Sequence, residues 1–282
     1  MDIDTLWEYS DPALSEERFR QALGSASGDE RLELLTQIAR SYSLRGRFDE
    51  AHRLLDEMEG ELAAAGARPR VCWVLERGRC FNSAGDEGMA RLLFVDAWDQ
   101  ARAAGLEGLA VDAAHMLAVT YAGSPEAIVW NQRGLAIACG SHDNKAHALI
   151  PPMLNNTAWD LHELGRFDEA LDLFREAQTE WLARGKLGPI RVATWAVARC
   201  LRSLRRYDEA LGILDALEAE HAAAGSVDGY VFEEIVEDLA ALGRTGEAKP
   251  YFGKAADALG KNEWFVKHEA GRLARLKERG ER

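Results

Sequence analysis

The chain has 282 residues, 47% of them apolar, and a formal net charge of −13. Nucleic-acid binding relies on basic surface that neutralises phosphates, so this acidic balance argues against a nucleic-acid partner and against an anionic membrane surface. No uncharged apolar run approaches about 18 residues, and the first residues are acidic, so we expect neither a membrane span nor a signal peptide.

The four cysteines, Cys72, Cys80, Cys139 and Cys200, show no C-x-x-C pairing or zinc-site spacing. We expect them to be buried free thiols of a reducing compartment, which predicts a cytoplasmic location. H-E-x-x-H, G-x-S-x-G and phosphate-cradling glycine motifs are absent from the sequence. The sequence therefore predicts a protein that is not an enzyme and has no metal or cofactor.

In chain order, residues 1–30 are predicted to form N-terminal capping helices, with a helix start at Ser10-Asp11-Pro12. Helices then follow in pairs between residues 31 and 258. The expected pairs are 30–44 with 49–65, 71–84 with 88–104, 106–121 with 125–139, 146–163 with 168–183, 190–204 with 208–223, and 230–242 with 245–259. Residues 259–282 are expected to form a C-terminal cap, a single helix over 262–278.

Two adjacent prolines interrupt the helix expected over residues 146–163. Pro151 and Pro152 would each remove a hydrogen-bond donor from a helix interior and clash with the preceding turn. Either the helix begins at Pro151 or it is kinked there. We favour a break or kink at this point.

One sequence pattern recurs along the chain and organises it. In the stretch 154–177, LNNTAWDLHELGRFDEALDLFREA, Gly165 suits the end of one helix, and Ala170 precedes Phe174 by one turn of the next. A small residue such as Ala170 lets two helices approach closely. The alanines at the equivalent place, separated by 39, 37, 43, 40 and 38 residues, are Ala51, Ala90, Ala127, Ala170, Ala210 and Ala248.

This unit resembles the second half of the tetratricopeptide (TPR) consensus, in which an alanine precedes an aromatic residue by four positions. The period exceeds the roughly 34 residues of the standard repeat, and the run Leu154–Ala158 is similar to repeats of the kinesin light chain type. The resemblance implies an all-α fold: a right-handed superhelical α-solenoid of about six TPR-like helical hairpins with terminal capping helices.

In TPR-like stacks the first helix of each repeat lines a concave surface. Counting 15, 11 and 8 residues back from each small alanine selects the side chains that the resemblance places on that surface. An arginine occupies the middle position in three of the six repeats. Together with a neighbouring asparagine, the candidate ligand-groove residues are Arg40, Arg79, Asn82, Asn155, Asn156, Trp159, His162, Trp195, Arg199 and Arg202.

These residue types favour a protein or peptide partner that carries acidic groups. Arginine binds carboxylates through two parallel hydrogen bonds, and arginine and tryptophan are the side chains that anchor interfaces. In kinesin-light-chain-like repeats asparagines at matching places grip the ligand backbone, so the resemblance implies that role for Asn155 and Asn156. The Lys and Asn set of the chaperone-binding carboxylate clamp is not reproduced, so chaperone tails are not implied.

Each candidate has a structural alternative. The arginines at 40, 79, 199 and 202 would instead pair with neighbouring acids such as Glu76 or Asp112. Trp159 and Trp195 would pack between repeats, and His162 would be a surface or hydrogen-bonded histidine.

We therefore expect a peptide- or protein-binding scaffold or adaptor. The alternative is a self-assembling structural protein, a homo-oligomer without a dedicated peptide ligand.

Overall fold

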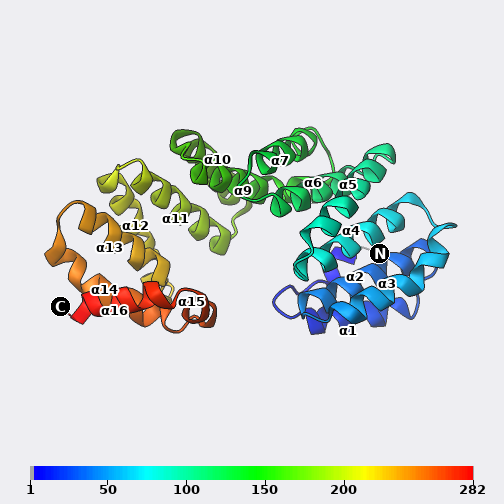
Figure 1. The fold of residues 1–282 in the computed structure, drawn as a ribbon, viewed down its shortest axis with the longest axis horizontal. Helices are drawn as coiled ribbons and strands as arrows, with labels where there is room; N and C mark the ends of the chain where they lie inside the picture. Colours follow the sequence, from blue (N-terminus) through cyan, green and yellow to red (C-terminus); the bar gives the residue numbers. More distant parts are fainter. Residues whose placement is uncertain (1–2, 282) are drawn as a thin grey trace. The chain divides into compact units, whose positions relative to one another are not determined.

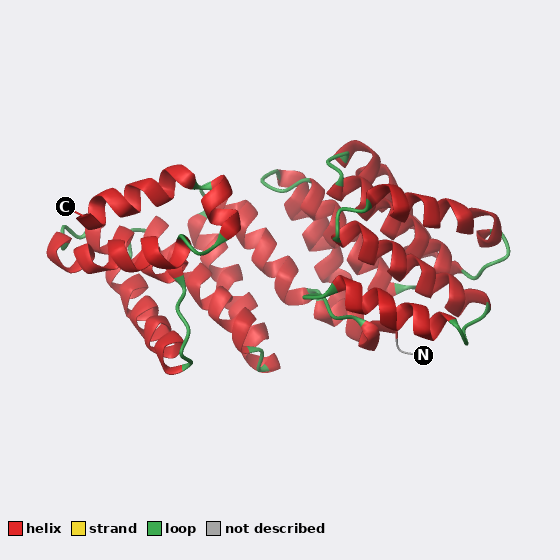
Figure 2. Cartoon of the chain, turned by 90° about the horizontal axis from the view of Figure 1, so that it is seen from below, coloured by secondary structure: helices red, strands yellow, loops and turns green. Residues whose placement is uncertain are grey.

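The computed structural model describes residues 3–281, and its regular secondary structure is helical throughout that range (Figure 2). The chain divides into two compact units, Met1–Asp160 and Leu161–Arg282, with the boundary inside helix α9 (Ile150–Glu163). The predicted division into caps and repeats at residues 30/31 and 258/259 stays a prediction. None of the described helices is both long enough and apolar enough to cross a membrane.

The first unit stacks helical hairpins in chain order (Figure 1). Before α9, its helices are η1 (Ile3–Leu6), α1 (Pro12–Leu23), α2 (Gly28–Leu44), α3 (Phe48–Leu62), α4 (Ala67–Ser83), α5 (Glu87–Ala103), α6 (Glu107–Thr120), α7 (Pro125–Ala138) and α8 (Asn144–Ala148). Helices α2, α4 and α6 lead the successive hairpins, and α4 packs against both α2 and α6. Their shared side is the side to which the sequence assigns ligand binding.

The second unit is also built from paired helices. Its helices after α9 are α10 (Phe167–Arg184), α11 (Leu187–Ser203), α12 (Tyr207–Ala223), α13 (Gly229–Ala241), α14 (Thr245–Leu259), α15 (Glu263–His268) and α16 (Ala270–Glu281). Helix α11 pairs with α12 and α13 with α14, and the leading helices α11 and α13 contact each other. The prediction of an all-α solenoid of TPR-like hairpins is confirmed.

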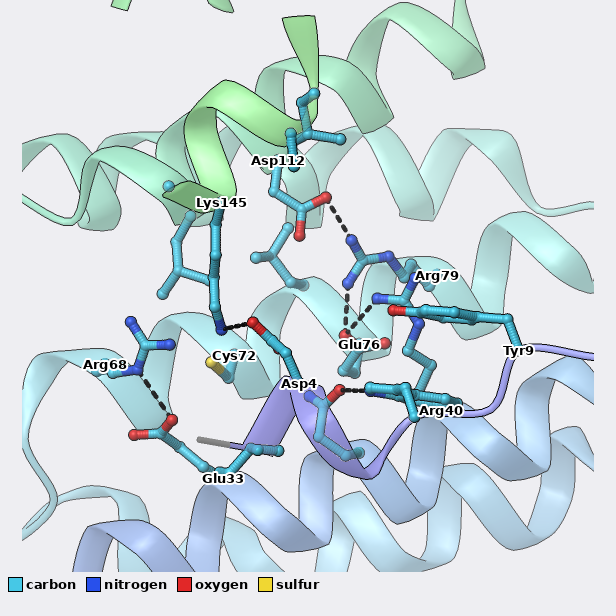
Figure 3. Close-up of a pocket in the computed structure, with 18 residues that line it drawn as sticks. Asp4, Tyr9, Glu33, Arg40, Arg68, Cys72, Glu76, Arg79, Asp112 and Lys145 are labelled. Atoms are coloured by element: carbon cyan, nitrogen blue, oxygen red, sulfur yellow. Dashed lines mark hydrogen bonds and ion pairs between the residues drawn. The ribbon is translucent and has the colours of Figure 1, made fainter. Parts of the chain in front are cut away.

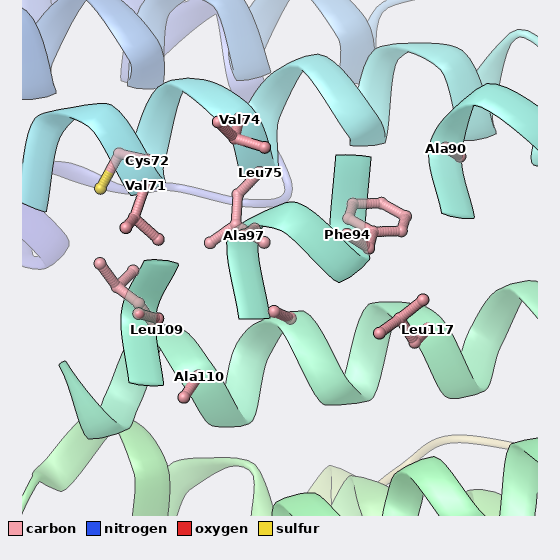
Figure 4. Close-up of a cluster of buried hydrophobic side chains, with 12 residues drawn as sticks. Val71, Cys72, Val74, Leu75, Ala90, Phe94, Ala97, Leu109, Ala110 and Leu117 are labelled. Atoms are coloured by element: carbon pink, nitrogen blue, oxygen red, sulfur yellow. The ribbon is translucent and has the colours of Figure 1, made fainter. Parts of the chain in front are cut away.

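The small alanines are buried, as their place in the repeat predicts. All six are at most 1% exposed. In the second hairpin, Ala90 and Phe94 of α5 lie in a cluster with apolar side chains of α4 and α6 (Figure 4). Gly78 of α4 makes room for the Phe94 ring, because a Cβ at position 78 would lie 2.6 Å from a ring carbon. Close packing in this hairpin therefore requires a glycine at position 78 as well as an alanine at position 90.

The turns inside the hairpins follow the expected pattern. Gly165 takes the left-handed conformation with φ of 76°, and the Arg166 amide donates to the Leu161 carbonyl at 2.9 Å, which satisfies a helix-end acceptor. Phe167 folds back over the turn, with its ring 4.9 Å from that of His162. In the fifth repeat Arg205, with φ of 58°, adopts the conformation that glycine adopts elsewhere.

The predicted break at the paired prolines is confirmed. Helix α8 ends at Ala148 and α9 begins at Ile150, so Pro151 and Pro152 fall in the first turn of α9. The first amides of a helix have no partner within the helix, so prolines there cost little.

Two sequence-based expectations are wrong. The C-terminal cap is not one helix over 262–278, because Glu269, with φ of −121° and ψ of 30°, separates α15 from α16. This break lets Phe265 of α15 and Leu273 of α16 both become buried, while Trp264 stays largely exposed. Cys139 is exposed rather than buried, because it follows the last residue of α7 at the start of a loop.

The other three cysteines are buried, and burial raises the pKa of Cys72 to about 12 and those of Cys80 and Cys200 to about 11. Thiols with such pKa values are poor nucleophiles at neutral pH.

Candidate ligand site

A cavity of about 230 Å³ lies on the shared side of α2, α4 and α6 in the first unit (Figure 3). Its walls include Arg40 of α2, Arg79 of α4 and Asp112 of α6. Ile3, Asp4, Trp7 and Tyr9, before α1, and Lys145 of α8 also line the cavity. We call this cavity the N-terminal pocket. It contains two of the ten side chains that the sequence selects.

An ion-pair network crosses the floor of the N-terminal pocket and joins its three helices. Arg79 pairs with Glu76, and its Nη2 lies 2.5 Å from Oδ1 of Asp112 on the next leading helix. Nη1 of Arg40 lies 3.4 Å from Oε1 of Glu76. The sequence-based alternative, in which these arginines pair with Glu76 and Asp112, therefore describes their contacts correctly.

Burial and charge act in opposite directions on this network. Burial disfavours the Arg79 cation, but the carboxylates of Asp112 and Glu76 outweigh it and raise the pKa of Arg79. Burial likewise opposes ionisation of Asp112, and Arg79 and Arg40 lower the pKa of Asp112 nonetheless. Arg79 and Asp112 are therefore both charged at neutral pH, and their ion pair links α4 to α6.

The second unit brings together Arg199, Arg202 and His162. Nε of Arg202 lies 2.6 Å from Oε2 of Glu234, a buried acid on the next leading helix, and Nε of Arg199 lies 3.4 Å from Oε1. Nη1 of Arg199 donates to the Ser203 hydroxyl at 2.8 Å, and Nε2 of His162 is also 2.8 Å from that hydroxyl. We call these five residues the C-terminal cluster.

His162 is neutral at physiological pH in this cluster. Burial, and then the charges of Arg199 and Arg202, lower the pKa of His162 to about 4. Its ring therefore contributes a hydrogen bond rather than a charge, as the structural alternative expects.

Trp195 packs between leading helices. Its Nε1 donates to the Tyr230 carbonyl at 3.3 Å, and the two rings meet edge to face. Inter-repeat packing was the alternative for this residue.

The remaining four candidates are half-buried, and they do not line the N-terminal pocket. Asn82 lies in the last turn of α4, and Asn155, Asn156 and Trp159 lie on α9. Their role in ligand binding stays a prediction.

Sequence reasoning missed part of the pocket wall. Asp4, Trp7 and Tyr9 line it, although the sequence assigned them only a capping role, and Lys145 comes from a loop-flanked short helix. The one available signal was two aromatic residues within three positions of a polar, acidic stretch. Among the described residues no group of three or more His, Cys, Asp or Glu is placed to hold a metal ion.

Helical hairpins stacked in chain order, with polar and half-buried side chains on the leading helices, define a helical-repeat solenoid. The tetratricopeptide repeat family model matches residues 31–58 and 153–177, which fall on α2–α3 and α9–α10. Two of the hairpins therefore match the tetratricopeptide repeat, and the resemblance predicted from the alanine–aromatic pattern is confirmed. No curated protein matches the sequence.

Three solved structures illustrate the similarity of fold. The apo form of RapI gives a TM-score of 0.74 at 12% identity over 93% of this chain and 74% of that one. A putative kinesin light chain from Podosopora anserina, with nearly identical TPR-like repeats, gives 0.57 at 18% identity over 71% and 99%. NprR in complex with its cognate peptide NprX gives 0.56 at 13% identity over 98% and 80%.

Proposed function

We propose that this protein is a scaffold or adaptor that binds a peptide, or a peptide-like segment of a protein, carrying acidic groups. One observation carries the proposal. In three arginine–glutamate pairs on the leading helices, the arginine is more exposed than its glutamate. Side-chain exposure is 24% for Arg40 against 3% for Glu76, and about 25% for Arg199 and Arg202 against 7% for Glu234. A chain of net charge −13 thus presents cations on its leading helices.

An arginine held from behind by a buried carboxylate is preorganised for a ligand group in front, either a second carboxylate or the face of an aromatic ring. Its side chain is already ordered, so less rotamer entropy is lost when a ligand binds. The complex of NprR with NprX supports a peptide as the ligand, since that protein shares this fold. The proposal places the protein in the cytoplasm, where its four cysteines remain free thiols.

The test is direct binding by fluorescence anisotropy to the full-length protein. The probes are peptides selected from a displayed random library, each paired with a version in which Asn and Gln replace Asp and Glu. We expect the acidic member of each pair to bind more tightly, and its affinity to fall by roughly tenfold as salt rises from about 0.05 M to about 0.5 M.

Two variants locate the binding surface. The first is Arg40→Gln. The second combines Arg199→Gln and Arg202→Gln with Glu234→Gln, because removing the arginines alone would leave a buried carboxylate unpaired. Arg175→Gln, on the exposed surface of α10, is the matched control. Selected acidic peptides that bind both variants as tightly as the wild-type protein would rule out the proposed surface.

Light scattering decides the alternative, self-assembly. We expect a molar mass that is constant over a hundredfold range of protein concentration. A mass that rises with concentration while no acidic peptide binds would favour the homo-oligomer instead.

A further inference from the structure

Residues 3–11 lie across the N-terminal pocket. They comprise the short helix η1 and the stretch leading to Asp11, whose side chain caps α1. Ile3, Asp4, Trp7 and Tyr9 of this segment line the same cavity as Arg40 and Arg79 (Figure 3). We call residues 3–11 the strap.

The strap contacts the pocket through the same kinds of interaction that a bound peptide would use. Oδ2 of Asp4 lies 2.9 Å from Nζ of Lys145, which is remote in sequence. Nε1 of Trp7 donates to Oε1 of Gln37 on α2 at 3.0 Å. The strap thus makes one carboxylate–ammonium ion pair and one indole–amide hydrogen bond to the wall of the pocket.

Two aromatic rings of the strap also contact the arginine that carries the proposed function. The rings of Trp7 and Tyr9 stack at 4.8 Å with an interplanar angle of 1°. The Arg40 guanidinium carbon lies 5.6 Å from the centre of the Trp7 ring and 5.8 Å from that of Tyr9, which is within cation–π range. Arg40 therefore interacts with Glu76 behind it and with aromatic rings in front of it.

We propose that the strap is a built-in ligand of the N-terminal pocket, and that the partner in trans carries the same chemistry. That partner is a short peptide segment with a carboxylate and with aromatic side chains three and five residues further on, matching Asp4, Trp7 and Tyr9. This proposal rests on the proposed function, because it names the class of segment that the pocket takes. Partner binding requires the strap to leave.

The contacts of the strap are those of a displaceable ligand. Tyr9 is 61% exposed, and the Asp4–Lys145 pair is about half exposed, so water screens the charges and competes for the rings. Trp7 is the strongest contact of the strap with the rest of the protein, because its ring also packs edge to face against Phe19 of α1, with the ring centres 5.0 Å apart. The pocket also keeps an unused donor, since Nε of Arg40 is buried with no hydrogen-bond partner among the described residues.

While the strap covers the pocket, a ligand in trans cannot bind. The apparent affinity of such a ligand is therefore its intrinsic affinity multiplied by the fraction of time that the pocket is open. If the strap covers the pocket nine-tenths of the time or more, opening it should tighten peptide binding by about tenfold or more. The probe is a fluorescein-labelled synthetic peptide of the strap sequence, IDTLWEYSD. One control peptide has alanine in place of both aromatic residues, and another has asparagine in place of its first aspartate.

The opened protein is the full-length Asp4→Ala, Tyr9→Ala variant. It removes the Asp4–Lys145 ion pair and the Tyr9 ring beside Arg40, which weakens the contact of the strap with the pocket, and both replaced side chains are exposed. We expect the strap peptide to bind this variant about tenfold more tightly than wild type. Adding Arg40→Gln should remove the gain, and both control peptides should bind at least about tenfold more weakly.

A second measurement follows the strap itself. Hydrogen exchange of residues 3–11 in the wild-type protein should become faster when the strap peptide is added at saturation, because the bound peptide displaces the strap. Equal affinity of the peptide for the opened and wild-type proteins, or unchanged exchange at saturation, would overturn the proposal. So would the absence of peptide binding to a folded opened variant.

These outcomes separate the two proposals. If library-selected acidic peptides bind and respond to the combined Arg199→Gln, Arg202→Gln and Glu234→Gln variant but are indifferent to opening of the strap, the proposed function stands and the strap proposal fails. If no library-selected acidic peptide binds either protein but the strap peptide binds the opened variant, the strap is a structural ligand of its own pocket, and both the adaptor function and the partner in trans fail.

Discussion

Replacing Asp238 with asparagine is expected to stabilise the protein at high pH and much less at low pH. Asp238 of α13 is fully buried, and neither carboxylate oxygen has a hydrogen-bond partner among the described residues. Burial, and next the negative charge of Glu234, raise the pKa of Asp238 to about 7, although Arg202 and Arg199 act in the opposite direction. The side chain is therefore costly to ionise in the folded state.

The sign and size of this change in stability follow from the linkage between proton binding and folding. Below about pH 4 an aspartate is protonated in both the folded and unfolded chains, so it costs nothing. Between about pH 4 and pH 7 the unfolded chain releases the proton and the folded chain keeps it, so stability falls as pH rises. One pKa unit is worth about 1.4 kcal/mol, which gives a penalty of about 1.5 kcal/mol at pH 5 and at most about 4 kcal/mol above pH 7.

The assay is urea unfolding, monitored by circular dichroism, at pH 5 and at pH 8.5. Differences between wild type and Asp238→Asn cancel the titration of every other group to first order. Asp257→Asn, an exposed position on α14, is the matched control and should change stability by less than about 0.5 kcal/mol at both pH values. If Asp238→Asn gives the same gain at both pH values, or no gain at pH 8.5, the buried-charge explanation is refuted.

Four further substitutions test the packing of the repeats by thermal or urea unfolding. Gly78→Ala should destabilise the protein because its methyl group would collide with the Phe94 ring. The control is Gly212→Ala, which has nothing within 4 Å and should stabilise α12 by about 0.5–1 kcal/mol. Equal effects of the two substitutions on stability would contradict the collision. Arg205→Gly should stabilise by about 1 kcal/mol, since its φ of 58° is strained for arginine, and a loss would show that the side chain matters more. Ala170→Leu should cost roughly 1–3 kcal/mol by overpacking, and a neutral result would mean that the repeat register is wrong.

The repeat architecture was predictable because it depends on the spacing of residues that are close together in the sequence. A small alanine such as Ala170, followed one turn later by Phe174, can recur only if the same hairpin recurs, and both side chains are fully buried. The proline pair at 151 and 152 likewise has a purely local consequence. These features depend on neighbours within a few residues, which a single sequence contains.

The missed features depend on tertiary contacts. The break at Glu269 is specified by burial of Phe265 and Leu273 rather than by any breaker residue, so helical periodicity alone predicts one continuous helix. The strap is invisible for the same reason, because Asp4 and Lys145 meet only once α8 is folded. Counting along helices identified the faces of the arginines and offered Glu76 and Asp112 as their partners, but it did not identify Glu234, which pairs with Arg199 and Arg202.

The ion pairs of the N-terminal pocket have a consequence for how its mutants are interpreted. Glu76 is shared by Arg40 and Arg79, and Arg79 in turn holds Asp112, so one continuous chain of charge runs through three successive repeats. Removing any member changes the electrostatic environment of the others, and the losses from single substitutions will not sum to the loss from their combination. Energies measured at this site belong to the network, and only double-mutant cycles can divide them among its residues.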